Sequence, residues 1–135
     1  MKSYSLGFVF SPDGQSVALV QKNRPPMLAG LFNGIGGQVE EGETPVQCCA
    51  REVQEEANLA VDTHDWSPMG VISDGETFAV HVFSAHSDLS QAQTMTDEPI
   101  SVFPVSEALD LPLAPSVFEI LEKWSAPQVR SQFRV

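Results

Sequence analysis

The sequence has few positive charges and no cluster of them. Seven lysines and arginines stand against 18 aspartates and glutamates among 135 residues, which gives a formal net charge of −11. Nucleic-acid backbones and anionic membrane surfaces attract proteins through basic stretches. The charge balance therefore disfavours both as partners.

Long apolar runs and well-separated cysteines are also lacking. No stretch reaches the roughly 18 apolar residues of a membrane-spanning helix, and the first residues lead into a strand pattern rather than a signal peptide. The only cysteines, Cys48 and Cys49, are adjacent. This spacing fits neither a disulfide framework nor a zinc site, so we expect two reduced thiols, with Cys49 buried. We expect one domain over residues 1–135, in the cytoplasm.

Short apolar segments separated by turn signals predict a strand-rich fold. Residues 4–10 and 16–20 read as a hairpin around the Ser-Pro-Asp-Gly turn at 11–14. Residues 87–97 are polar and read as a loop. The other predicted elements are a glycine-broken extended segment over 31–39, strands at 60–61, 69–72, 77–85 and 99–105, and a helix over 115–124. Residues 126–135 carry no clear pattern.

The best-defined element is a helix that is predicted to begin at Pro45. Thr44 is a good N-cap, and Gln47 completes a capping box. Apolar residues then recur at three- and four-residue steps and form one stripe that can pack on a core. This stripe consists of Val46, Cys49, Ala50, Val53 and Ala57.

Three glutamates share one patch of this predicted helix. Glu52, Glu55 and Glu56 are spaced i, i+3 and i+4, so their carboxylates repel one another unless a cation neutralises them. Arg51 can pair with Glu55, but one arginine cannot balance the group. Carboxylate oxygens suit Mg²⁺ or Mn²⁺, and such ions also bind substrate phosphates. Taken alone, however, three glutamates are more often a solvated helix face.

The residues upstream favour a ligand site over a solvated face. Gly34, Gly36 and Gly37 surround Ile35, and glycines let the backbone turn tightly and approach a ligand closely. For this reason Gly36 is placed among the candidate substrate-binding residues. The segment is not a P-loop, because it lacks the Gly-Lys-Ser/Thr ending.

Residues 37–59 resemble the Nudix box, G-x5-E-x7-R-E-U-x-E-E-x-G-U, in which U is apolar. Asn58 stands where the pattern has its last glycine. Asparagine tolerates a left-handed helix end, so we expect the turn to survive. The positions that match in register are Gly37, Glu43, Arg51, Glu52, Val53, Glu55, Glu56 and Leu59.

The resemblance implies an α/β/α sandwich around a mixed sheet, and hydrolysis of a nucleoside diphosphate linked to another group at a pyrophosphate phosphorus. Arg51 would orient the glutamates, and Glu43 would be a structural or outer partner. The water proton would go to Glu52 or to a glutamate outside the box. The Mg²⁺ or Mn²⁺ ligands implied by the family are Glu52, Glu55, Glu56 and the carbonyl of Gly37.

Three charged residues outside the box are further candidates. Glu98 precedes a predicted strand, where related enzymes carry an additional metal-binding or basic glutamate; an ordinary loop acid is the alternative. Lys22 and Arg24 follow the second predicted strand. They would suit phosphate contact, although isolated loop cations are equally often solvated.

Residues 30–37 and 42–44 resemble the MutT-like members of the family, which sanitise oxidised purine nucleoside triphosphates. By this resemblance Asn33 would hydrogen-bond the base. The mammalian member of that group reads the oxidised base with a tryptophan and paired aspartates before its last helix, whereas residues 113–116 here are Leu-Ala-Pro-Ser. Met27 also replaces an aromatic pocket residue. Selectivity for 8-oxo-purines is therefore not expected.

Three functions are consistent with these features. The first is hydrolysis of a nucleoside triphosphate to the monophosphate and pyrophosphate, which the complete acidic set and Asn33 favour. The second is hydrolysis of ADP-ribose or a sugar nucleotide. The third is a non-catalytic module that binds nucleotides. The expected partner is a small nucleotide, and the chain would be a monomer or a homodimer.

Overall fold

The computed structural model describes residues 1–123. Trp124, at the end of the predicted last helix, and the segment 126–135 lie outside the described residues. Within residues 1–123, no helix is both long and apolar enough to cross a membrane. The strands are β1 (Lys2–Phe10), β2 (Ser16–Gln21), β3 (Phe32–Asn33), β4 (Ile35–Gln38), β5 (Ser67–Ser73), β6 (Phe78–His86) and β7 (Ile100–Pro104).

The strands of the described region form one mixed sheet. Its order is β3-β2-β1-β6-β5, with β4 also paired to β1 and β7 to β2. β1 and β6 run parallel from the pair Lys2 and Phe78 to the pair Phe10 and His86. The other pairings are antiparallel. Strand β6, which is rich in β-branched and aromatic residues, thus lies inside the sheet, as this composition predicts.

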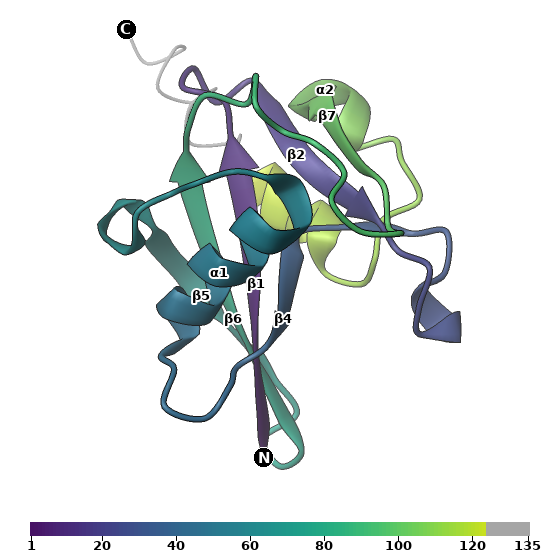
Figure 1. Ribbon diagram of the computed structural model, residues 1–135. Coiled ribbons are helices and arrows are strands. Elements are labelled where there is room, and N and C mark those ends of the chain that lie inside the picture. The colour runs from purple at the N-terminus through teal and green to yellow at the C-terminus, as the bar shows by residue number, and fades with distance from the viewer. Residues whose placement is uncertain (124–135) are drawn as a thin grey trace, which may run out of the picture.

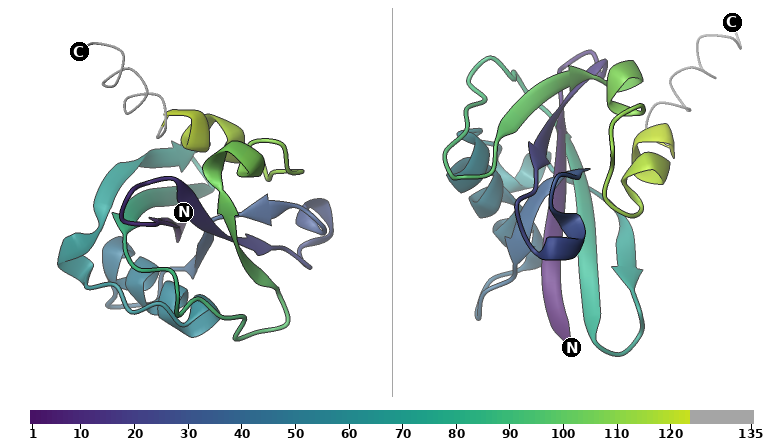
Figure 2. Two further views of the ribbon diagram at one scale, coloured as in Figure 1. Left: turned by 90° about the horizontal axis from the view of Figure 1, so that it is seen from above. Right: turned by 90° about the vertical axis from the view of Figure 1, so that its right-hand side faces the viewer.

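Helices cover both faces of the sheet (Figures 1 and 2). Helix α1 (Pro45–Ala57) covers one face, and the short α2 (Val105–Ala108) and a helical segment over residues 117–123 cover the other. Alternate residues of β1 face opposite layers, because successive side chains of a strand point to opposite sides. Val9 packs in the cluster that contains Val53 of α1, whereas Phe8 packs with Leu121. This is the expected α/β/α sandwich.

Helix α1 begins and ends as its sequence predicts. The backbone N–H of Gln47 donates to Thr44 Oγ1 at 3.3 Å, and the backbone N–H of Thr44 donates to Gln47 Oε1 at 2.9 Å. At the other end, Asn58 adopts the left-handed conformation with φ 58° and ψ 32°. The capping box and the surviving helix end are both confirmed.

Three predictions on secondary structure need correction. Residues 60–61 form no strand: Val61 is buried beside α1 without a strand partner, and the 3-10 helix η2 (Thr63–Asp65) follows at once. The predicted helix over 115–124 begins two residues later, at 117. The pattern of residues 99–105 predicted a strand to 105, but Val105 begins α2. The 3-10 helix η1 (Pro26–Leu28) lies in the predicted loop after β2.

Candidate functional site

Arg51 connects the acidic residues of the box. Its Nε donates to Glu43 Oε2 at 2.7 Å and its Nη2 donates to Glu43 Oε1 at 3.0 Å. Its Nη1 reaches Glu52 Oε1 at 2.9 Å and Glu55 Oε2 at 3.3 Å. The hydrogen bonds from Arg51 lower the pKa of Glu43 to about 2. Arg51 therefore forms hydrogen bonds with three glutamates that lie on two different segments.

The glycines before α1 make room for the glutamates and for the sheet. A Cβ on Gly37 would lie 2.7 Å from Cδ and Oε1 of Glu52. A Cβ on Gly36 would lie 1.9 Å from the carbonyl oxygen of Ser5. The Gly37 carbonyl accepts a hydrogen bond from the Cys48 thiol at 3.6 Å. The backbone contact requires glycine at position 36, whereas a side chain at position 37 would displace the carboxylate of a candidate metal ligand.

Glu56 lies where a negative charge is disfavoured. Its Oε2 is buried and has no hydrogen-bond partner among the described residues. Burial and the adjacent Glu52 carboxylate raise the pKa of Glu56 to about 8. A cation beside this pair would offset both effects. A buried acceptor without a donor, next to a second carboxylate, is consistent with a site for a hard divalent ion.

The carboxylates do not yet surround a common point. Within residues 1–123, no three acidic, histidine or cysteine side chains lie close enough together to hold a metal ion as they stand. Glu52 and Glu55 turn toward Arg51 instead. The Glu55 side chain is 60% exposed and is free to turn away from the arginine. By its chemistry, a set of carboxylate oxygens fits a hard divalent ion.

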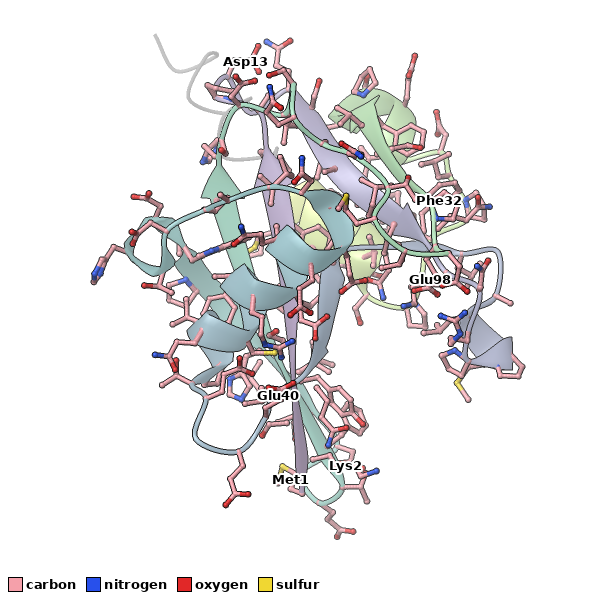
Figure 3. All side chains as sticks on the ribbon, viewed as in Figure 1. Met1, Lys2, Asp13, Phe32, Glu40 and Glu98 are labelled. Atoms are coloured by element: carbon pink, nitrogen blue, oxygen red, sulfur yellow. The ribbon has the colours of Figure 1, made fainter. Side chains whose placement is uncertain are left out.

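Lys22 and Arg24 each form an ion pair with an acidic residue from the loop before β7. Lys22 Nζ donates to Glu98 Oε1 at 2.8 Å, and the backbone N–H of Asn23 donates to Glu98 Oε2 at 2.7 Å. Glu98, labelled in Figure 3, comes from the loop before β7. Arg24 forms an ion pair with Asp97. β2 and β7 are paired strands of the sheet, and this pairing brings the loop after β2 next to the loop before β7.

One cavity of about 420 Å³ unites most of the predicted site residues. Gly37, Arg51, Glu43 and Asn33 are not among the residues that line it. Thr96 and Asp97 also line it, although no separate role was predicted for them; their position directly before Glu98 is the signal that could have identified them. The lining consists of Lys22, Arg24, Gly36, Glu52, Glu55, Glu56, Thr96, Asp97 and Glu98.

Asn33 lies on β3, and its Oδ1 accepts the backbone N–H of Gly34 at 2.8 Å. The neighbouring Phe32 pairs with Leu113, so the 113–116 segment does run beside the predicted base-binding strand.

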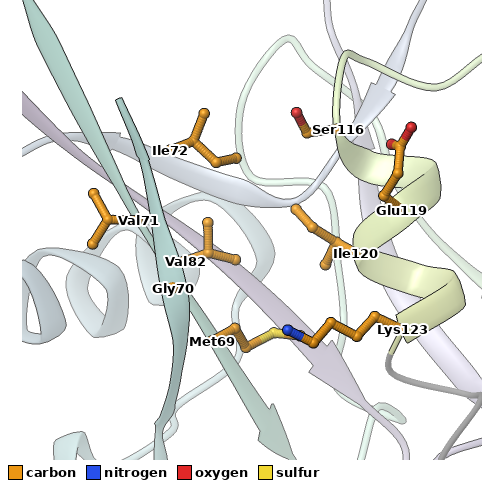
Figure 4. A pocket seen from close by; sticks show the side chains of 9 residues that line it. All are labelled: Met69, Gly70, Val71, Ile72, Val82, Ser116, Glu119, Ile120 and Lys123. Atoms are coloured by element: carbon orange, nitrogen blue, oxygen red, sulfur yellow. The ribbon is translucent and has the colours of Figure 1, made fainter. Parts of the chain in front are cut away.

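A second cavity of about 230 Å³ lies between β5, β6 and the segment 117–123 (Figure 4). Its apolar wall includes Ile72, Val82 and Ile120.

The chain resembles known proteins over most of its length. The NUDIX domain model matches residues 4–124. The oxidized purine nucleoside triphosphate hydrolase of Mus musculus is 41% identical over 85 residues, which are 61% of this chain and 53% of the relative. The protein of the same name from Danio rerio is 45% identical over 60 residues, 42% of this chain and 38% of that relative. The chain therefore spans about half or less of the length of these curated relatives.

Solved structures share the fold. A structure from work on MutT of Aliivibrio salmonicida and Vibrio cholerae has a TM-score of 0.79 at 17% identity, covering 93% of this chain and 98% of its own. The NUDIX domain of Shewanella oneidensis NrtR, complexed with ADP ribose, has a TM-score of 0.77 at 18% identity, covering 94% and 87%. The architecture is the Nudix fold. Since the domain model matches most of the chain, the protein belongs to the NUDIX family.

Proposed function

We propose that the protein hydrolyses a nucleoside triphosphate to the monophosphate and pyrophosphate with the help of Mg²⁺ or Mn²⁺. One observation carries the proposal. The buried, unpartnered oxygen of Glu56 lies beside Glu52 in a cavity that Lys22 and Arg24 also line. A polyphosphate that brings a divalent ion complements this lining, because the ion suits the carboxylates and the phosphate oxygens suit the cations.

Glu52, Glu55 and Glu56 would hold the ion. When bound, a divalent ion neutralises phosphate oxygens and lowers the pKa of a bound water. Arg51 would orient Glu52 while Glu43 holds the guanidinium in place. The family resemblance also implies a role for the Gly37 carbonyl, but Gly36 is the glycine that lines the cavity. We therefore propose that the backbone of Gly36 is the part of this segment nearest the substrate.

The base would be bound beyond the phosphate cavity, near Asn33. The curated relatives are named as oxidized purine nucleoside triphosphate hydrolases, which supports a purine triphosphate. The Leu113 to Ser116 segment that runs beside Phe32 carries no tryptophan or aspartate. A site without such polar partners discriminates weakly between bases. We therefore propose a nucleoside triphosphatase of the pyrophosphate-releasing kind with little selectivity for an oxidised base.

Product analysis across a nucleotide panel tests the proposal. The panel contains the ordinary and 8-oxo-purine triphosphates, ADP-ribose and a sugar nucleotide, each assayed with Mg²⁺, with Mn²⁺ and with EDTA. Metal-dependent release of pyrophosphate and a monophosphate from a triphosphate is expected. Turnover confined to ADP-ribose or the sugar nucleotide would replace the substrate class, and metal-dependent binding without turnover would indicate a nucleotide-binding module.

A further inference from the structure

A short chain of polar contacts crosses the layer between α1 and the sheet. Helix α1 packs on β1 and β4 (Figure 1), and Cys49 and Val53 fill this layer with apolar groups. Ser5 of β1 and Cys48 of α1 also lie there, 2% and 0% exposed. A buried hydroxyl is costly unless it is hydrogen-bonded. The Ser5 hydroxyl donates to Cys48 Sγ at 3.0 Å, so a thiol of the helix satisfies it.

The Cys48 thiol continues this chain toward the candidate site. It donates to the Gly37 carbonyl at 3.6 Å and accepts a hydrogen bond from Arg51 Nη2 at 3.8 Å. Sulfur is larger than oxygen, so its hydrogen bonds are longer, and a thiol is a weak donor and a weak acceptor. The sulfur nevertheless has three partners in three places, which are β1, β4 and the side chain of Arg51.

Two of these partners adjoin the cavity that contains the box glutamates. Gly37 directly follows Gly36, which lines the cavity. Arg51 donates to Glu52 at 2.9 Å and to Glu55 at 3.3 Å, and both glutamates line the same cavity. A displacement of the buried sulfur would therefore affect the cavity through the backbone of β4 and through the guanidinium.

We propose that Cys48 is a positioning residue, which holds the Gly37 peptide and the Arg51 guanidinium in place beside the cavity while Ser5 fixes the direction of its thiol. A buried polar chain whose members are all paired favours one arrangement of the groups it joins. An apolar side chain would fill the layer without joining them. Small displacements of groups that position the reactants slow catalysis. The catalytic consequence rests on the proposed function, whereas the arrangement of the thiol does not.

Three variants form a matched set. Cys48→Ala removes the contacts, and Cys48→Ser keeps a donor and an acceptor. Cys49→Ala is the control, because the Cys49 thiol is equally buried but forms no side-chain hydrogen bond within residues 1–123. Cys49 Sγ packs against β1 at Gly7, where an added Cβ would lie 2.6 Å from it. Both alanine variants remove one buried sulfur, so both should unfold at a lower temperature than wild type.

Kinetics on the best triphosphate at saturating Mg²⁺ separate positioning from packing. Cys48→Ala should lower kcat about tenfold and change KM less than about threefold, the pattern of an interaction that matters in the transition state. Cys48→Ser should recover kcat to within about threefold of wild type, and Cys49→Ala should stay within the same limit. An unchanged kcat in Cys48→Ala would overturn the proposal. Equal losses in the two alanine variants would overturn it as well, since packing alone would explain them.

Ser5→Ala decides the question if Cys48→Ala does not fold. This variant leaves the sulfur in place but removes the hydroxyl that directs it. It should lower kcat about threefold at nearly constant KM. An unchanged kcat in folded Ser5→Ala would contradict the proposal.

The infrared S–H stretching band tests the arrangement in metal-free protein without any turnover. A thiol that donates an S–H···O hydrogen bond absorbs at a lower frequency than one that does not. Each alanine variant retains one thiol, which assigns the two bands. The Cys48 band should lie lower than the Cys49 band, and Ser5→Ala should move it. If the wild type hydrolyses no nucleotide, the proposed function fails while a lowered Cys48 band still supports the arrangement. Coincident bands would contradict the arrangement itself.

Discussion

Arg51 binds the Glu43 carboxylate through two parallel hydrogen bonds, at 2.7 and 3.0 Å. Such bidentate pairs fix direction as well as distance. The geometry leaves Nη1 to reach Glu52, the next residue, and Glu55, one turn further along α1. Glu43 is thus linked through Arg51 to two glutamates that line the cavity, and its role as an outer partner stays a prediction.

The ion pair between Glu43 and Arg51 predicts that the stability of the protein depends on pH. The pKa of Glu43 falls from 4.5 to about 2 because of the hydrogen bonds from Arg51. A lowered folded-state pKa contributes stability that is present above pH 4.5 and is lost as the pH falls toward 2. Urea unfolding of wild type and Glu43→Gln should differ most above pH 4.5 and converge toward pH 2. An equal difference at pH 6 and pH 2.5 would contradict the pairing.

The raised pKa of Glu56 predicts that, in the absence of metal, the contribution of this residue to stability falls as the pH rises. Burial and Glu52 raise its pKa to about 8, so the contribution of the protonated form is present below pH 4.5 and is lost as the pH rises through 8. In EDTA at pH 9, Glu56→Gln should therefore unfold at a higher temperature than wild type. Mg²⁺ should raise the unfolding temperature of wild type more than that of the variant. The idea fails if Mg²⁺ stabilises both proteins equally.

The two glycines before α1 should respond differently to an added methyl group. Gly37→Ala places a Cβ against the Glu52 carboxylate, a flexible group that can move aside. This variant should fold but lose at least about tenfold in kcat, because Glu52 shifts. Gly36→Ala places its Cβ 1.9 Å from the Ser5 carbonyl and should impair folding. Circular dichroism and kinetics on both variants test this, and a fully active Gly37→Ala enzyme would refute it.

Local signals in the sequence predicted the elements that position the site. The Thr44 capping box, the apolar stripe of α1 and the hairpin turn each act within a few residues, so one sequence is enough to read them. Residues 60–61 were misread because Val61 owes its burial to α1, which local pattern does not reveal. The start of α2 at Val105 was missed because apolar residues continue through a strand end into a one-turn helix.

The sequence predicted which residues belong to the candidate site better than it predicted how these residues are arranged. The spacing of the box placed Glu52, Glu55 and Glu56 on one side of α1, and the cavity contains all three. The pairing of Arg51 with Glu55 was also predicted, because the two residues lie four positions apart. The pairing of Lys22 with Glu98, however, depends on contacts between segments 76 residues apart. Such contacts arise from the pairing of β2 with β7. The roles of these residues, including metal binding by Glu98, stay predictions.

The left-handed end of α1 offers a stability test. Asn58 replaces the glycine of the box pattern and adopts φ 58°. Asn58→Gly should change the free energy of unfolding little, since glycine favours this conformation while the bond from Asn58 Nδ2 to the Gln91 carbonyl is lost. Asn58→Ala should cost about 1 kcal/mol, because alanine lacks the polar side chain that lets asparagine adopt the left-handed conformation. Equal stability of the two variants would mean that the helix end relaxes.

The central claim is that Glu56 helps to hold the metal that hydrolysis requires. The most direct measurement is pyrophosphate release from the best triphosphate at saturating Mg²⁺ by wild type and by folded Glu56→Gln. The account predicts that wild-type turnover disappears in EDTA and that the variant loses at least about a thousandfold in kcat, the scale of a lost electrostatic contribution to the transition state. A variant that retains more than about a tenth of wild-type turnover would contradict it.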